Sequence, residues 1–322
     1  MSMPEEIVID PAVIKELQQF EDAISDVDLE IAAKQWLMTK DIFAKRQNSI
    51  AKIPGFWSVV FDKAVSELEA AITPRDNVIF QQALTAIEVD RPEIPASAKT
   101  TDTGIDKFGE PRSMTIAFHF KENDFFADTV LRKTFYYRYG NDGSTGLVSE
   151  PVKINWKAGK DVTEGLSDAA YGFWQAQKAN ASQQLDAALS GDARKARDAA
   201  AREMPEYKAL AAMIEEKEMG ATSFFNFFSY RGRWTSAAES VQAKAEAMAK
   251  RAKAGEIDEE DEDEDEEEFP EEHVETFPPG HDVAVTIGDD IFPSAIDYFL
   301  EDDIDSDIDL DSDDDEDEEM EG

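Results

Sequence analysis

"PAVIKELQQFEDAISDVDLEIAAKQWLMTKDIF", residues 11–43, has the most regular pattern of the chain. Its apolar residues recur at alternating intervals of four and three positions, the a/d pattern of a coiled coil. We call these positions the seam, and they are Val13, Leu17, Phe20, Ile24, Val27 and Ile31, followed after a lapse at Lys34 by Met38 and Ile42. The spacing predicts one amphipathic helix with a continuous apolar stripe.

Prolines set the limits of this helix at residues 11–52. Pro11 suits the first turn with Asp10 as its N-cap, and Pro54 ends the helix. At 1.5 Å per residue its length is roughly 63 Å, far longer than the usual globular helix. It comes before the other elements, so no sequence neighbour covers its stripe. One interpretation places it on its own domain; we favour a dimerisation helix that pairs with a second copy of itself.

The negative charge is concentrated in the last 68 residues. The 322-residue chain has a formal net charge of −40, but from Gly255 onward there are 34 Asp and Glu and no Lys or Arg. Residues 1–254 hold the remaining 38 acidic residues against 32 basic ones. Because such acid density cannot be buried, we expect disorder at residues 255–276 and 302–322, and also at residues 1–10. The negative electrostatic field of these acidic residues attracts basic partners and repels nucleic acid and membranes.

Several function classes are excluded by what the sequence lacks. It has no cysteine, no secretory signal and no apolar run near the ~20 residues of a membrane span, which predicts a soluble intracellular protein. HExxH, GxSxG, GxGxxG and Walker motifs are missing, and the three histidines lack metal-site spacing. The aspartate-rich tail lacks the sixth-position glycine of a calcium loop. We expect no enzyme activity, no catalytic residue, no cofactor and no metal site.

The middle of the chain predicts an α+β domain. Strand-like runs follow one another without helices between them, which favours an antiparallel sheet. These runs lie at residues 85–93, 113–120, 129–139 and 147–156, and helices are expected at residues 56–71, after Pro74, at 205–220 and at 237–254. Residues 179–204 are rich in alanine, serine and charge, so we interpret them as a mobile or solvent-exposed helical insertion.

Two apolar segments beyond the first acid run extend this domain. In "HDVAVTIGDDIF", residues 281–292, Val283, Val285 and Ile287 alternate as in a strand, and Pro293 then begins an expected helix. A lone strand and a short helix cannot bury enough surface to be stable. Both segments are therefore predicted to pack on earlier parts of the chain, which gives a folded domain over residues 53–301.

Two other clusters allow two interpretations each. The aromatic run "SFFNFFSYRGRW", residues 223–234, fits a core anchor better than a nucleobase-stacking platform with Arg231 and Arg233 on phosphates, because the chain is so acidic. Lys250, Arg251 and Lys253 form a small basic patch, which is either a nuclear import signal or the solvated end of a helix. We expect no direct contact with nucleic acid.

Six stretches in a fixed order resemble the nucleosome assembly protein (NAP) family, especially its shorter SET-like branch. They are "IPGFWSVVF", "LTAIEVDRPE", "IAFHFKENDFFADTVLRKTFYY", "INWKAGKDVT", "SFFNFFS" and "GDDIFPSAIDYFLED". They run from Ile53 to Asp302 and follow the long helix, as they do in the family. The insertion at residues 179–204 matches least well.

The resemblance implies a homodimer joined by the long helices, with an earmuff-type α/β domain on each subunit and a histone-binding underside between the two lobes. Family members are histone chaperones, so the implied partners are core histones and a second copy of the chain. The implied role is to shield histones from nonspecific DNA contacts and to assist nucleosome assembly and disassembly. SET-like members also modulate histone-modifying enzymes and a phosphatase, which leaves a regulatory subunit of an acetyltransferase or phosphatase as the alternative. The implied location is nuclear, with shuttling to the cytoplasm left open.

The candidate histone-binding residues are all acidic. Glu215 and Glu216 form a pair on the helix before the aromatic run. The others lie in the acid runs: Glu259, Glu260, Asp261, Glu262, Asp263, Glu264, Asp313, Asp314, Asp315 and Glu316. An exposed ion pair contributes only about 0–1 kcal/mol, so we expect these acids to steer and shield histones while the folded underside orients them.

Overall fold

The computed structural model describes residues 11–64, 68, 71–141, 143–216, 222–253 and 274–301. The disorder expected at residues 1–10, 255–276 and 302–322 lies outside these ranges, apart from residues 274–276. There the prediction is wrong, because Thr276 is buried and its hydroxyl lies 2.7 Å from that of Ser229. None of the helices in the described ranges combines the length and hydropathy of a membrane span.

Helices account for most of the described elements. They are α1 (Pro11–Ile50), α2 (Phe56–Lys63), α4 (Pro74–Ala83), α5 (Leu166–Ala179), α6 (Gly191–Arg202), α7 (Pro205–Glu216), α8 (Ala237–Lys253), α9 (Gly280–Val285) and α10 (Ala295–Leu300). Short 3-10 turns are η1 (Ile105–Lys107), η2 (Ala181–Gln183) and η3 (Phe224–Ser229), whereas η4 (Thr286–Ile291) is π-helical.

The strands form one antiparallel sheet in the order β1-β2-β3-β4. They are β1 (Leu84–Asp90), β2 (Met114–Phe120), β3 (Val130–Tyr139) and β4 (Thr145–Ser149). Phe118 of β2 pairs with Ile87 on one side and with Leu131 on the other, so apolar side chains line up across one face. The sheet and the long first helix confirm the predicted α+β fold.

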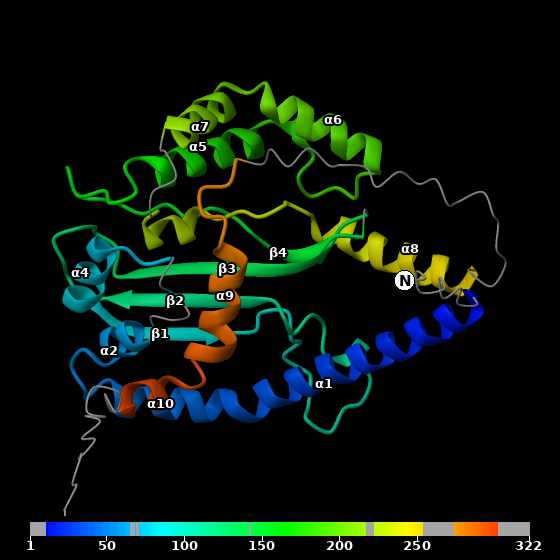
Figure 1. Cartoon of the computed structure of the whole chain (residues 1–322), viewed down its shortest axis with the longest axis horizontal. Helices are drawn as coiled ribbons and strands as arrows, with labels where there is room; N and C mark the ends of the chain where they lie inside the picture. Colours follow the sequence, from blue (N-terminus) through cyan, green and yellow to red (C-terminus); the bar gives the residue numbers. More distant parts are fainter. Residues whose placement is uncertain are drawn as a thin grey trace, which may run out of the picture.

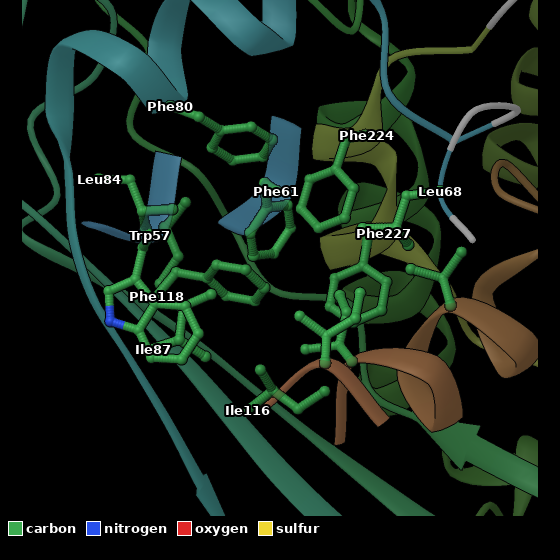
Figure 2. Close-up of a cluster of buried hydrophobic side chains, with 14 of the residues drawn as sticks. Trp57, Phe61, Leu68, Phe80, Leu84, Ile87, Ile116, Phe118, Phe224 and Phe227 are labelled. Carbon is green, nitrogen blue, oxygen red and sulfur yellow. The ribbon is translucent and has the colours of Figure 1, made fainter. Parts of the chain in front are cut away.

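The two faces of the sheet differ in polarity. Figure 2 shows side chains from α2, α4, β1, β2 and η3 gathered against one face, where the rings of Phe61, Phe118 and Phe224 lie within 6.4 Å of one another. On the other face, His119 Nε2 lies 3.3 Å from a Glu88 carboxylate oxygen. The main core therefore lies on one side of the sheet, as expected when helices cover one face of an antiparallel sheet.

The aromatic run is a core anchor, as predicted. Its four phenylalanines in η3 are completely buried. Three residues per 3-10 turn place side chains i and i+3 above each other, and Phe224 stacks on Phe227 with 5.2 Å between ring centroids. The buried Asp76 carboxylate caps α4 and accepts hydrogen bonds from the Ser223 hydroxyl and the Phe224 N–H, at 2.6 and 2.8 Å. These bonds fix η3 against α4.

The strand predicted through Val283, Val285 and Ile287 is wrong, because the segment forms α9 and η4. Its buried residues follow the helical spacing of three, one, three, one and three: Gly280, Val283, Ala284, Ile287, Gly288 and Ile291. A Cβ on Gly288 would lie 2.6 Å from Met114 Sδ, so glycine allows η4 to approach β2 closely. The expected helix after Pro293 is confirmed as α10, and the whole segment packs on the main core as predicted.

Two other predicted elements end early or are interrupted. The predicted strand 147–156 ends at Ser149, because Pro151 has no N–H for the ladder, and Val152 N donates to Phe228 O at 2.8 Å instead. The helix expected over residues 56–71 is interrupted, because α2 ends at Lys63 and Ala64 leaves the helical conformation, whereas Leu68 is helical again.

Helices α5, α6 and α7 form a separate layer with a small core of Leu166, Ala170, Phe173, Ala201 and Leu210. The helix predicted within residues 179–204 is confirmed as α6, but solvent exposure is wrong for one face of it. Arg194 and Arg197 of α6 are 5% and 6% exposed. In Figure 1, α1 lies along the β1 edge of the sheet, and the α5–α7 layer lies beyond the β4 edge.

Candidate functional site

The seam of α1 is exposed along its whole length. Its eight side chains range from 44% exposed at Val13 to 66% exposed at Met38. They are half of the sixteen large apolar side chains exposed in the described part of the chain. A contiguous apolar patch of this kind on a folded subunit marks an interaction surface. The structure thus places all the predicted seam residues on one unpaired stripe.

The opposite face of α1 holds the helix on its own domain. Ala33 and Ile50 are buried, and Phe43 packs against the main core. From Val13 to Asp28, by contrast, the side chains with a described environment are exposed, apart from the half-buried Asp22. The seam and the docking face therefore lie on different sides of α1, and a partner on the seam would not disturb the docking.

Arg46 anchors the C-terminal half of α1. Its guanidinium donates to the carbonyl oxygens of Phe292 and Pro293 at 2.7 and 2.8 Å, just before α10. The same group lies 4.6 Å from the Phe43 ring centroid and 4.7 Å from that of Phe292. Burial lowers the pKa of Arg46. Residues at the far end of the chain thus hold the long helix in place.

A second anchor lies closer to the middle of α1. A Glu30 carboxylate oxygen accepts a hydrogen bond from the N–H of Gly104 at 2.7 Å. Lys34, where the seam lapses, pairs with Glu30 at 2.6 Å and lies 5.8 Å from the centroid of the buried Phe108 ring. The lapse in the apolar pattern therefore has a structural reason, because Lys34 contacts the subunit's own domain.

The candidate histone-binding acids are only partly within the described residues. Glu215 and Glu216 are exposed at the end of α7. Figure 1 places α7 beyond the β4 edge, far from α1, so the structure does not bring this pair to the seam. The candidates in the runs at 259–264 and 313–316 lie outside the described residues.

Sequence reasoning missed a cluster of buried charges around α6. Arg194 pairs with Glu239 of α8, and both side chains are almost completely buried. Arg197 pairs with Asp198 at 2.8 Å. The signal in the sequence was the three-residue interval between the two arginines, which puts both on one face of α6. A cavity next to this cluster is lined by residues of α5, α6 and the segment 231–234.

Two further titratable groups, His281 and Lys133, have structural partners. His281 Nδ1 accepts a hydrogen bond from Leu147 N at 3.2 Å. Lys133 of β3 is fully buried and donates to the carbonyl oxygens of Glu150, Phe228 and Tyr230 at 2.7–3.1 Å. Burial lowers the pKa of Lys133 to about 7. In the ranges that the structure describes, no three His, Cys, Asp or Glu residues are grouped to hold a metal ion.

Comparison with known proteins places the chain in a family. The NAP1-related protein 1 of Arabidopsis thaliana is 32% identical over 154 residues, which cover 47% of this chain and 51% of the relative. Nucleosome assembly protein 1-like 1 of Xenopus tropicalis is 34% identical over 119 residues, covering 34% and 26% of the two chains. The alignments thus span about half the length, or less, of these curated relatives.

The solved structures and the family model extend this comparison. The crystal structure of Vps75 superposes with a TM-score of 0.49 at 17% identity, covering 90% of this chain and 98% of that one. The model of the nucleosome assembly protein (NAP) family matches residues 11–184, from the start of α1 through the sheet and α5. Since this match covers more than half of the chain, the protein belongs to the nucleosome assembly protein family.

Proposed function

We propose that this chain is a histone chaperone that acts as a homodimer joined by its α1 helices. The observation that carries the dimer is the exposed seam, because its eight apolar side chains have no cover in a single chain. Full burial of a large aliphatic side chain stabilises a complex by about 1.5–3 kcal/mol. The a/d spacing fits a second copy of α1, since each seam residue would insert between residues of an identical helix.

Histones are the proposed cargo because of family membership and charge. The chain belongs to the nucleosome assembly protein family, and from Gly255 onward it holds 34 acidic residues without a single basic one. Core histones are basic, and an acidic chain raises their association rate by long-range attraction, on the order of 10- to 1,000-fold. This attraction weakens as salt rises.

The acid runs compete with DNA only moderately. An extended chain spaces its charges by about 3.4 Å, whereas duplex DNA carries one charge per about 1.7 Å. The runs therefore remove histones from loose, nonspecific DNA contacts and yield to the well-formed contacts of a nucleosome. A chaperone needs this balance in order to release its cargo, and the proposed role is to shield histones during nucleosome assembly and disassembly.

Two measurements test the proposal. Analytical ultracentrifugation should find a dimer at micromolar concentration, and a monomer there would remove the dimer. Pull-down with recombinant core histones at about 0.15 M salt should retain histones, and a chain cut after Asp303 should retain fewer. Absence of histone binding to the full chain would remove the chaperone role while leaving the dimer untouched.

The finer roles follow the same proposal. Cargo release in the nucleus agrees with the basic patch Lys250, Arg251 and Lys253 at the end of α8, and a fluorescent fusion should move toward the cytoplasm when these three are changed to alanine.

The alternative role is regulation of an acetyltransferase or a phosphatase. A chain cut after Asp303 that lost histone deposition but kept the effect on such an enzyme would favour the alternative.

A further inference from the structure

The cavity beside α6 is unusual in an acidic protein because arginines line it. It has room for about 40 Å³ between α5, α6 and the segment 231–234. Arg194, Arg197, Arg202, Arg231 and Arg233 all contribute to its wall. Arg202 and Arg233 are partly exposed, so the cavity can be reached from the surface.

Three of these arginines have an N–H group without a partner. Arg194 and Arg197 are more than nine-tenths buried, and their Nε and Nη1 atoms respectively make no hydrogen bond in the described structure. The Nε of Arg231 is also buried and unpaired. A buried donor left without a partner costs roughly 1–3 kcal/mol, so three around one cavity call for an acceptor inside it.

The acidic groups of the wall are already engaged. Asp198 accepts from Arg197 Nε at 2.9 Å. Glu275 accepts from the backbone N–H groups of Arg231, Gly232 and Phe277, each at 3.0 Å. In the described structure neither carboxylate is hydrogen-bonded to the three unpaired N–H groups, although both reduce the positive charge.

Charge and size together indicate the kind of acceptor. The wall holds five arginines and two carboxylates, and Glu239 also pairs with Arg194, so these eight groups together carry two positive charges in excess. A phosphate group carries about −1.5 to −2 at neutral pH, whereas a carboxylate carries only −1. A space of 40 Å³ holds roughly three water molecules, which the three free oxygens of a phosphate group can replace.

The aromatic wall supports the same ligand. The Arg231 guanidinium carbon lies 4.9 Å from the Trp174 ring centroid and 5.7 Å from that of Phe173. Stacking holds the planar fork in one orientation while leaving its edge free for oxygen atoms. Burial, followed by the neighbouring Arg197, lowers the pKa of Arg231 to about 10, and a bound anion would relieve this repulsion.

We infer that this cavity is a binding site for a phosphate group, contacted by Arg194, Arg197 and Arg231. The shared chemistry admits free inorganic phosphate or a small phosphomonoester. The inference goes beyond histone binding, because the cavity is lined by residues of α5–α7 and of segments 231–234 and 274–275, and neither the seam nor the candidate histone-binding acids contribute to its wall.

Isothermal titration of inorganic phosphate into the full chain tests the site, with chloride used to keep the ionic strength constant. We expect saturable binding of one phosphate per chain. Arg231→Gln should weaken it at least tenfold; the buried Nε of Arg231 has no partner to lose, but the stacking on Trp174 and Phe173 is lost, so circular dichroism checks that this variant is folded. Arg197→Gln should do the same, with circular dichroism to check folding. Arg132→Gln, an exposed arginine of β3, should change the affinity by less than twofold.

A second titration distinguishes a site for free inorganic phosphate from a site for a phosphomonoester. Phosphoethanolamine binding at least tenfold tighter than inorganic phosphate identifies a phosphomonoester site, and equal or weaker binding identifies a site for the free ion. The inference is overturned if phosphate shows no saturable binding beyond chloride. It is also overturned if Arg132→Gln reduces the affinity as much as Arg231→Gln does. Histone pull-down is a separate measurement, so failure of one proposal leaves the other standing.

Discussion

Helices α1 and α6 lie beyond opposite edges of the same sheet, and they distribute their side chains in opposite ways. The α1 helix exposes large apolar residues, with Phe20 and Ile24 both more than half exposed, whereas α6 buries two arginines. Exposed apolar surface is stabilised by an external partner, and a buried charge needs a partner inside the fold. We therefore expect a partner from outside the chain at the α1 edge, whereas the charges at the α6 edge are paired within the fold.

Charges on the seam should produce the largest effect. In Phe20→Glu/Ile24→Glu, each helix would bury two unpaired carboxylates in a dimer, which costs roughly 5 kcal/mol or more and raises the dimer Kd over a thousandfold. Sedimentation measures the change. The matched control is Gln18→Glu/Gln19→Glu, which adds the same charge away from the seam and should remain dimeric. Equal weakening in both variants would mean that net charge, and not the seam, controls association.

Loss of the buried ion pair at α6 should produce the second-largest effect. Glu239→Ala leaves the Arg194 charge buried without its carboxylate, which should lower the free energy of unfolding by about 3–5 kcal/mol. Urea unfolding measures this. The double variant Arg194→Met/Glu239→Leu removes both charges and should recover most of the loss. If Glu239→Ala cost less than about 1 kcal/mol, the α6 edge would not depend on an internal charge partner.

The two edges also differ in how well the sequence predicts them. The seam was predictable because a stripe of period 3.5 is a local property of α1, and all eight residues lie where the spacing placed them. Whether a second copy covers them is a property of the complex and stays a prediction. At the α6 edge the three-residue interval of Arg194 and Arg197 indicates a shared face, but its burial was not predictable, because Arg194 and Glu239 are 45 positions apart and each looks like an ordinary solvated residue.

The strand prediction for the segment of α9 and η4 was wrong for a different reason. Val283, Val285 and Ile287 alternate over five residues, and this short run matches a strand as well as a helix. Only the longer pattern from Gly280 to Ile291, with both glycines counted as buried positions, distinguishes the helix. Glycine carries no hydropathy signal, so its burial becomes visible only from the tertiary packing.

A smaller effect is expected where α1 docks on its own domain. Arg46→Met keeps the volume of the side chain but loses two hydrogen bonds to carbonyl oxygens, which should cost about 1–2 kcal/mol because the group is only partly buried. Lys45→Met is the control, since Lys45 is exposed. Both variants should stay dimeric in sedimentation. Weaker dimerisation of Arg46→Met alone would show that docking and pairing on α1 are coupled.

The smallest effect, about 1 kcal/mol between pH 7 and 8, concerns Lys133, a buried charge that, unlike the arginines of α6, can lose its proton near neutral pH. Burial lowers its pKa from 10.5 to about 7 in the folded chain. Between these two values the unfolded chain holds the proton and the folded chain does not, so the free energy of unfolding rises with pH, by at most about 1.4 kcal/mol per unit. Below pH 7 both states are protonated and this rise is absent.

Urea unfolding of the wild type and Lys133→Met at pH 7, 8 and 9 isolates this contribution. From pH 7 to 8 the free energy of unfolding of the wild type should rise by about 1 kcal/mol more than that of the variant, because the folded lysine loses its proton in this range. Lys121→Met, which removes an exposed lysine, should follow the wild type at each pH. Parallel curves for wild type and Lys133→Met would mean that the three carbonyl acceptors keep Lys133 charged, so that it behaves like the arginines of α6.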